Sequence, residues 1–240
     1  MRKALMLLAC MTSTTLSHGA IAWVQDASAG ATPAVTLKVA FGSNVTAGAL
    51  IVVTARVGAT GRTVTSTDTL ANVYSLDASK IQITDVHVND IFSTYNSAGG
   101  ANTVTINMSG AGARMGMTIR EYSGAATAVS PVDVSSNAIG ADASVECGTL
   151  TMTKDGVIVT GWGYQNNQTT TLDTDYANLE QETTGRLGSA QRITTAITDE
   201  AIHTASASNN WSCVSVAYSE PAAGGAVAPV LRRPAFLMRR

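Results

Sequence analysis

Two glutamates have the spacing that glycoside hydrolysis uses. Glu180 and Glu182 are two residues apart in a strand-like segment, so both side chains share one face with Cα atoms about 7 Å apart. Glycosidases place paired carboxylates roughly 5 to 9.5 Å apart. Polar residues that alternate along a strand are also the ordinary solvent face of a half-buried sheet. We expect that solvent-face role for Glu180 and Glu182.

Asp85, His87 and Asn89 alternate in the same way. An Asp/His pair on one strand face is a minimal metal-binding motif. Because Val86 and Val88 alternate on the opposite face, the pattern is also that of a wet sheet edge. We expect the sheet edge.

Other candidates for metal or nucleophile chemistry are sparse. Asp173 and Asp175 could offer oxygens to Ca²⁺, but a full site needs six or more, so we expect turn acids. His18 lies near the N-terminus, and His203 has no cysteine or carboxylate at zinc spacing. The chain also lacks a Gly-x-Ser-x-Gly elbow. We predict no catalytic residue, no metal, no cofactor and no enzymatic activity.

The segment Gly161–Gln168 combines two aromatic rings with an amide-rich loop. Trp162 and Tyr164 share a strand face, and Asn166 and Asn167 follow directly. Sugar-binding sites use this chemistry, since a ring covers the apolar face of a pyranose while amides bond its hydroxyls. Trp211, after two asparagines, is a further candidate. The alternative is that these rings belong to the core.

The chain has three cysteines, and two of them could form a disulfide. Cys10 lies in an N-terminal apolar run, which leaves Cys147 and Cys213 as a pair. Both point away from the apolar face of their own strand, which permits a bridge if the strands are neighbours. Such a bridge would close a loop of 66 residues and stabilise by roughly 4 kcal/mol. Two unpaired thiols remain the alternative.

Composition limits the partners of the chain. It has 240 residues, 45% hydrophobic and 13% charged, with net charge −2 and pI near 5.9. The apolar fraction is that of a globular protein. Because no basic field exists, we expect no binding to nucleic acid.

The first twenty residues resemble an export signal. Arg2 and Lys3 precede the apolar run 4–11, and small residues follow before Ala20. The run is too short to span a bilayer. Residues 7–10 also resemble a lipoprotein cleavage box. We expect a secreted or cell-surface protein. Met1 retained in the mature protein would instead indicate assembly inside a cell, as in a virion.

Period-two hydrophobicity dominates residues 21–219. Residues 35–41 alternate cleanly, and residues 49–57 are nearly all apolar, as in a strand covered on both faces. Many short strands separated by Gly, Asn and Asp favour an antiparallel sandwich. No repeat of fixed period is evident. The expected strands are 21–25, 35–41, 49–57, 72–76, 81–95, 102–108, 114–122, 144–153, 156–164, 176–183, 186–195, 202–207 and 211–219.

Residues 220–240 differ in composition from the rest. Pro, Gly and Ala fill 221–229, which is typical of a linker, and four arginines surround a small apolar patch in 231–240. We expect a disordered or extended tail. It serves either as a solubilising tail or as a docking peptide for a partner or an anionic surface.

Several phrases of the chain resemble an uncharacterised β-sandwich domain of exported bacterial proteins and phage virion proteins. They are Val-Thr-Leu-Lys-Val-Ala-Phe at 35–41, Asn-Val-Thr-Ala-Gly at 44–48, Asn-Thr-Val-Thr-Ile at 102–106 and Ile-Arg-Glu-Tyr-Ser-Gly at 119–124. That domain is similar to the jelly-roll sandwiches of concanavalin-like lectins and glucanases. The resemblance implies a jelly-roll-like fold over 21–219 and a setting outside the cytoplasm. It implies no catalytic residues.

The sequence is therefore compatible with three functions. The first is a non-catalytic structural or adhesive surface protein, outside the cell or on a virion as a decoration or fibre. The second is a lectin-like, carbohydrate-binding module. The third is a glycoside hydrolase on the same fold, which needs two converging carboxylates. Bacterial or phage origin, ligand and oligomeric state stay undetermined.

Overall fold

The structure, a computed structural model, describes residues 20–221, and every helix or strand assigned within them is a strand. Eighteen strands form antiparallel ladders, which confirms the predicted all-β antiparallel sandwich class. Residues 20–221 contain no apolar helix of the length that a bilayer crossing needs. Residues 1–19 and 222–240, which hold most of the predicted export segment and tail, lie outside the described residues.

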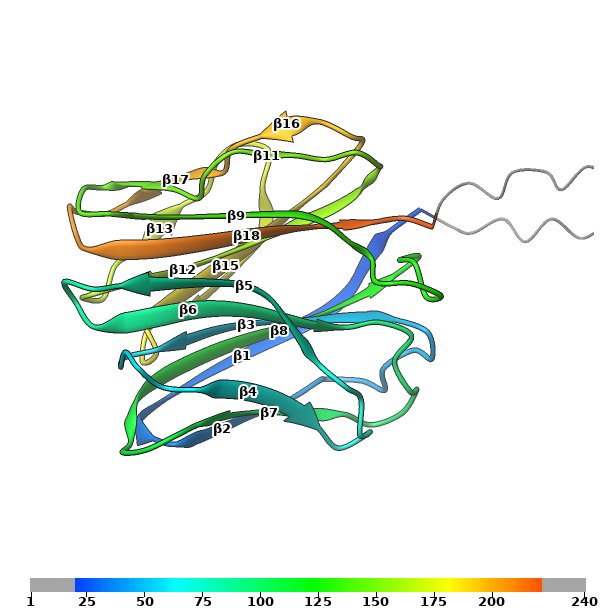
Figure 1. Cartoon of the computed structure of the whole chain (residues 1–240), viewed down its shortest axis with the longest axis horizontal. Coiled ribbons are helices and arrows are strands. Elements are labelled where there is room, and N and C mark those ends of the chain that lie inside the picture. The colour runs from blue at the N-terminus through cyan, green and yellow to red at the C-terminus, as the bar shows by residue number, and fades with distance from the viewer. Residues whose placement is uncertain (1–19, 222–240) are drawn as a thin grey trace, which may run out of the picture.

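The strands stack in four layers (Figure 1). Outer sheet 1 contains β2 (Thr36–Ala40), β7 (Thr103–Met108) and β4 (Val64–Asp68). Inner sheet 1 contains, in order, β1 (Ala22–Ala34), β8 (Ala113–Ser123), β3 (Leu50–Val57), β6 (His87–Thr94) and β5 (Ser75–Gln82). Inner sheet 2 contains β14 (Ala177–Glu182), β15 (Leu187–Thr194), β12 (Gly156–Tyr164), β18 (Trp211–Ser219) and β9 (Val132–Gly140). Outer sheet 2 contains β10 (Ser144–Glu146), β17 (Ile202–Ala205) and β13 (Thr170–Thr171), beside a short ladder of β11 (Leu150–Thr151) and β16 (Thr198–Asp199).

Three cores separate the four layers. The first core lies between outer and inner sheet 1, and the second between inner and outer sheet 2. The middle core lies between the two inner sheets. Strand β3 shows how alternation produces this arrangement, because Ile51 and Val53 face the first core whereas Leu50 and Val52 face the middle one. Its whole length is buried, as its nearly continuous apolar sequence indicated.

The two halves of the chain have the same topology. The strands of the two inner sheets correspond one to one. In order, β1, β8, β3, β6 and β5 of inner sheet 1 match β9, β18, β12, β15 and β14 of inner sheet 2. Outer sheet 1, in the order β2-β7-β4, likewise becomes β10-β17-β13. When the short β11/β16 ladder of the second half is left out, each half has eight strands, and their neighbours are first with eighth, third with sixth and second with seventh, which is the winding of a jelly roll. The molecule is thus two eight-stranded sandwiches packed through their inner sheets, which we call the N-terminal and C-terminal sandwiches.

Two tyrosines cross the middle core in corresponding positions. Tyr122 of β8 pairs with Leu50, and Tyr218 of β18 pairs with Val157. The Tyr122 hydroxyl donates to Gln191 Oε1 in the opposite sandwich. The Tyr218 hydroxyl donates in return to Asp77 Oδ2 at 2.7 Å. The two tyrosines therefore make reciprocal bonds across the middle core, although their acceptors lie on strands that do not correspond, β15 and β5.

Removal of either hydroxyl should weaken the interface between the sandwiches. We expect Tyr218→Phe to lower the free energy of unfolding by about 1.5–3 kcal/mol, since its acceptor is a carboxylate. Tyr122→Phe, whose acceptor is a neutral amide, should cost about 0.5–1.5 kcal/mol. Urea unfolding measures both. Tyr95→Phe, with a 37% exposed ring, is the matched control and should change stability little.

Two buried arginines of the N-terminal sandwich also reach the C-terminal one. Arg56 donates to the carbonyl oxygens of Tyr164 at 2.9 Å and Gly185 at 3.3 Å. Arg120 donates to those of Asn178 at 2.7 Å and Ser189 at 3.0 Å. Burial lowers the pKa of Arg56 to about 10, so it remains charged near neutral pH. Planar guanidinium forks suit this bridging of carbonyls on different strands.

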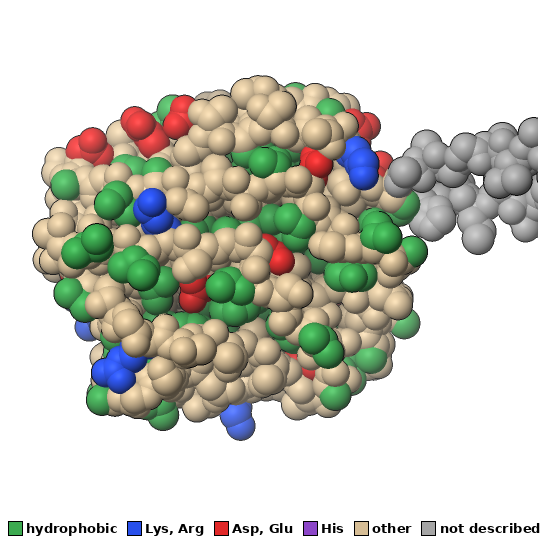
Figure 2. Space-filling model, in the orientation of Figure 1, with side chains coloured by type: hydrophobic (Ala, Val, Ile, Leu, Met, Phe, Trp, Pro, Cys, Tyr) green, Lys and Arg blue, Asp and Glu red, His purple; other side chains and the backbone are tan. Residues whose placement is uncertain are grey.

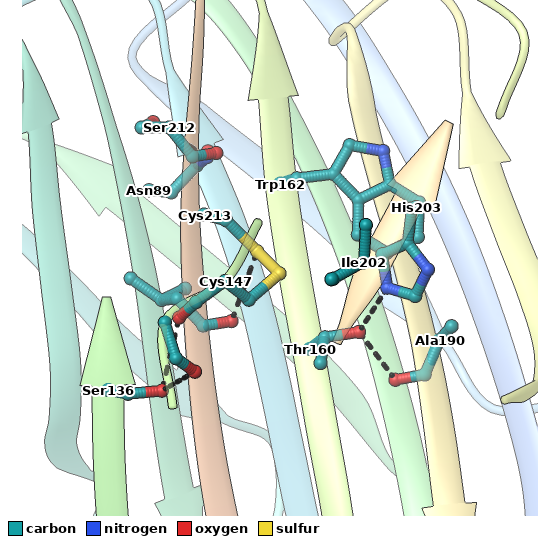
Figure 3. The surroundings of a disulfide bond; sticks show 12 residues. Asn89, Ser136, Cys147, Thr160, Trp162, Ala190, Ile202, His203, Ser212 and Cys213 are labelled. Carbon is teal, nitrogen blue, oxygen red and sulfur yellow. Dashed lines mark hydrogen bonds between the residues drawn. A yellow bond between two sulfur atoms is a disulfide. The ribbon is translucent and has the colours of Figure 1, made fainter. Parts of the chain in front are cut away.

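A disulfide joins Cys147 to Cys213 inside the C-terminal sandwich, with Cα atoms 4.8 Å apart (Figure 3). Cys213 belongs to β18, and Cys147 follows β10. Both side chains face the second core and are fully buried. The Ser136 hydroxyl donates to the Cys147 carbonyl oxygen at 3.1 Å, which fixes the chain beside the bridge.

Candidate functional site

The rings predicted to contact sugar are buried. Trp162, Tyr164 and Trp211 are 0%, 2% and 3% exposed and lie in the second core. They belong to β12 and β18, inner strands of a sheet that is covered on one face by outer sheet 2 and on the other by the N-terminal sandwich. The Trp162 indole N–H donates to Thr170 Oγ1 at 3.2 Å. The expectation of glycan contact at these rings is corrected, because no ring face is open.

The amide loop that follows them is exposed but isolated. Asn166 and Asn167 lie on the surface after β12. The neighbouring Tyr164 ring turns inward, where its hydroxyl meets Thr170 Oγ1 at 2.9 Å. The five residues predicted as a glycan site therefore do not form one surface.

The carboxylates considered for glycoside hydrolysis are engaged in separate structural bonds. Glu180 accepts from Ser28 Oγ at 2.7 Å, and Glu182 accepts from the backbone of Gly185. Glu121, a further glutamate that is fully buried, accepts from the Thr46 backbone N–H at 2.7 Å. Each bond fixes a different loop or strand contact, so these carboxylates support the fold in three places.

Asp173 and Asp175 also act within the fold. Asp175 forms an ion pair with Arg192 at 2.9 Å, and Asp173 accepts from the backbone N–H of Asp175. Among residues 20–221, no group of three or more His, Cys, Asp or Glu side chains is placed to hold a metal ion.

An arrangement that the sequence did not predict lies between the two sandwiches. Asp85 Oδ2 is 2.7 Å from His87 Nδ1, and His87 Nε2 is 2.9 Å from Ser212 Oγ. Asp85 lies in the turn before β6, His87 is the first residue of β6, and Ser212 belongs to β18. This is the order and spacing of a Ser-His-Asp triad. The side chains expected on a wet edge, His87 and Asn89, are instead fully buried.

The hydrogen-bond directions of this triad follow from its partners. Asp85 accepts from His87 Nδ1–H, so the neutral ring accepts at Nε2 from the Ser212 hydroxyl. Asn89 Nδ2 donates to Ser212 Oγ at 2.9 Å and to the Ser212 carbonyl at 2.6 Å. Burial and the nearby Arg56 guanidinium lower the pKa of His87. The imidazole is therefore neutral, as in a resting serine hydrolase.

The side chains of this triad are closed off from solvent. Ser212 and His87 are both 0% exposed. Ser212 lies between β12 and β9 in its sheet, and Figure 3 shows Asn89 directly beside it. A nucleophile needs an acyl carbon within reach of Oγ and donors for the oxyanion. Here the Asn89 amide is already bonded to Ser212, so the triad joins the two sandwiches.

His203 is the second buried histidine, and it packs in the second core. Its ring centroid is 4.3 Å from that of Trp162 (Figure 3). Its Nδ1 accepts from the Asp173 backbone N–H at 3.2 Å, and its Nε2 lies 3.3 Å from Thr160 Oγ1. A second ring proton would abolish the bond from Asp173. Burial lowers the pKa of His203 to about 4.

This histidine predicts a loss of stability in acid. Its pKa is about 4 when folded and about 6.5 when unfolded, so the unfolded chain takes up the proton first as pH falls. The stabilising contribution is complete above pH 6.5 and is lost toward pH 4. Between pH 7 and pH 4.5 we expect His203 to account for a loss of about 2–3 kcal/mol. Urea unfolding of wild type and His203→Gln at both pH values measures this difference, and equal losses would contradict it.

Comparisons with known proteins found no counterpart for this chain. No protein-family model, no curated protein and no solved structure matches it.

Proposed function

We propose that the protein is a non-catalytic structural or adhesive component, displayed outside the cell or on a virion. The observation that carries this proposal is the burial of Ser212 and His87, the groups closest to catalytic geometry. The acidic and basic side chains of the described core form hydrogen bonds and ion pairs between the layers. This is the arrangement expected of a rigid scaffold. The resemblance to exported and virion domains supports the same function.

Two further features support display outside the cytoplasm. The disulfide between Cys147 and Cys213 is of a kind that persists in oxidising compartments. The face in Figure 2 carries few charged side chains, and hydrophobic side chains are scattered over it. Detection of the chain in culture medium or in surface fractions would support a secreted or cell-surface location. Detection in purified particles with Met1 retained would assign it to a virion.

A fluorophosphonate probe tests the non-catalytic proposal directly. Such probes label serines that a histidine activates and that substrate can reach. We expect no labelling of the folded protein, while a known serine hydrolase in the same reaction is labelled. Stoichiometric labelling that disappears in both Ser212→Ala and His87→Gln would overturn the proposal and indicate a hydrolase.

A carbohydrate-binding module is the second candidate, at a different site from the predicted one. A hollow of about 420 Å³ is lined by Asn72, Ser75, Thr94, Tyr95 and Asn96. Its lining has an exposed ring, amides and hydroxyls but no charged side chain, which suits a neutral saccharide. A glycan array on the purified protein tests this candidate. Binding abolished by Tyr95→Ala but kept by Trp23→Ala, another exposed ring, would support it; no binding at millimolar sugar would exclude it.

A further inference from the structure

A groove opens on the flank of the N-terminal sandwich, between β4 and the pair β5/β6. Its volume is about 290 Å³. Leu76 and Ile81, which are 54% and 45% exposed, lie along it, and Val64 and Val88 add apolar surface. Figure 2 shows hydrophobic side chains along the strip where β5 and β6 run. The groove therefore combines an apolar strip with polar side chains, and nothing among residues 20–221 covers it.

The corresponding place in the C-terminal sandwich is filled. Ala55 pairs with Asp90 across β3 and β6, and the equivalent pair across β12 and β15 is Trp162 with Gly188. The Trp162 indole lies directly over Gly188, where any Cβ would collide with it. Gln181 also ties β14 to β13, since its Oε1 accepts from the Thr170 backbone N–H at 3.2 Å. The N-terminal sandwich lacks this filling, so the groove is a feature of one half only.

In the N-terminal sandwich, the carboxylate of Asp90 lies at the position that corresponds to Gly188. Asp90 lines the groove yet is 5% exposed. Ser79 is its cross-strand neighbour on β5, and the described residues provide no ion pair for it. Arg62 also lines the groove, but its Nη1 donates to the Ser109 carbonyl at 3.3 Å, on outer sheet 1. A buried carboxylate beside apolar side chains favours a cation that carries its own apolar surface.

The chain contains a segment of this chemistry. Residues 231–240 read Leu-Arg-Arg-Pro-Ala-Phe-Leu-Met-Arg-Arg, with four arginines and four large apolar side chains. We propose that this segment docks in the groove of its own chain, with one arginine paired to Asp90 and apolar side chains covering Leu76 and Ile81. Leu231 is ten positions after Pro221, a stretch that spans up to about 35 Å when extended. A compact body of some 200 residues, with a radius of gyration near ~16 Å, is roughly 40 Å across. The linker together with the ten residues of the segment itself spans more than this, so the groove is within reach.

Photo-crosslinking tests the proposal on the full chain. p-Benzoylphenylalanine replaces Phe236, and mass spectrometry maps its crosslinks after irradiation. We expect crosslinks to residues 60–64 and 75–90 in the monomer band. Asp90→Asn should reduce their yield at least several-fold, whereas Glu146→Gln, which alters an exposed acid of the C-terminal sandwich, should leave it unchanged.

Salt provides a second measurement that needs no change at the groove. Since an arginine–carboxylate pair is screened by ions, crosslink yield should fall between about 0.05 M and 0.5 M NaCl. Crosslinks mapped elsewhere, or a yield unaffected by both Asp90→Asn and salt, would overturn the proposal. Crosslinked dimers in place of the monomer product would also overturn it and assign the groove to a second copy.

Discussion

Replacing Arg120 by alanine should lower the free energy of unfolding by about 3–5 kcal/mol. The guanidinium is 1% exposed and pairs with Asp26 at 3.3 Å while it donates to the Asn178 and Ser189 carbonyls. Truncation leaves these acceptors buried without a donor, and an unpaired buried group loses more than its bond was worth. Urea unfolding of the full chain measures the change.

Arg114→Ala is the matched control, on the same strand β8. Arg114 also donates across to the C-terminal sandwich, at the Thr184 carbonyl, but the residue is only half-buried and this bond is exposed to solvent. Its removal should therefore cost less than about 1 kcal/mol. Arg120→Lys keeps the charge but cannot form a planar fork, so it should recover only part of the loss. A cost below 1 kcal/mol for Arg120→Ala would show that the sandwiches adhere without it.

The faces of the strands were predictable from alternation, whereas the number of layers was not. Residues 49–57 indicated a strand covered twice, and β3 has that burial. The same reasoning placed His87 and Asn89 on a wet edge, because a polar face of a single sandwich points to water. Here that face meets the second sandwich, and β6 is buried throughout. Period two identifies which residues share a face but not what covers that face.

A local signal for the burial of Trp162 was present in the sequence. Gly161 and Gly163 alternate with the aromatic residues on β12. Their Cα atoms approach the N-terminal sandwich so closely that a Cβ at Gly161 would collide with Thr54, and one at Gly163 with Arg56. Glycine at alternate strand positions indicates close approach of another layer. This makes the aromatic face the core side of an inner strand, and glycan stacking there is excluded.

The internal repeat escaped detection because its spacing is irregular. Leu50 and Val157 correspond, 107 residues apart, whereas Tyr122 and Tyr218 correspond 96 residues apart. Loops of different length shift the strands between these positions, so no fixed period survives in the sequence. The Asp85–His87–Ser212 triad escaped for a related reason. Its serine is 125 residues from the histidine, and only the packing of the two sandwiches brings them together.

Removing the disulfide should cost about 4 kcal/mol, because it closes a loop of 66 residues in the unfolded chain. Both sulfur atoms are buried in the second core, so Cys147→Ala with Cys213→Ala also leaves unfilled space in that core. We expect a fall in unfolding free energy of at least this size, measured in urea without reductant. The unfolding free energy of the wild type, measured again in the presence of reductant, should fall by a similar amount.

Cys10→Ala is the control for loss of a cysteine as such, and it should leave stability unchanged. Thiol titration in denaturant provides an independent measurement. The chain has three cysteines, so a bridged protein should react at one thiol, or at none if residues 1–20 have been removed. Three reactive thiols in protein purified without reductant would contradict the bridge. The expected stabilisation would then be absent, and the structural support for an oxidising location would be lost with it.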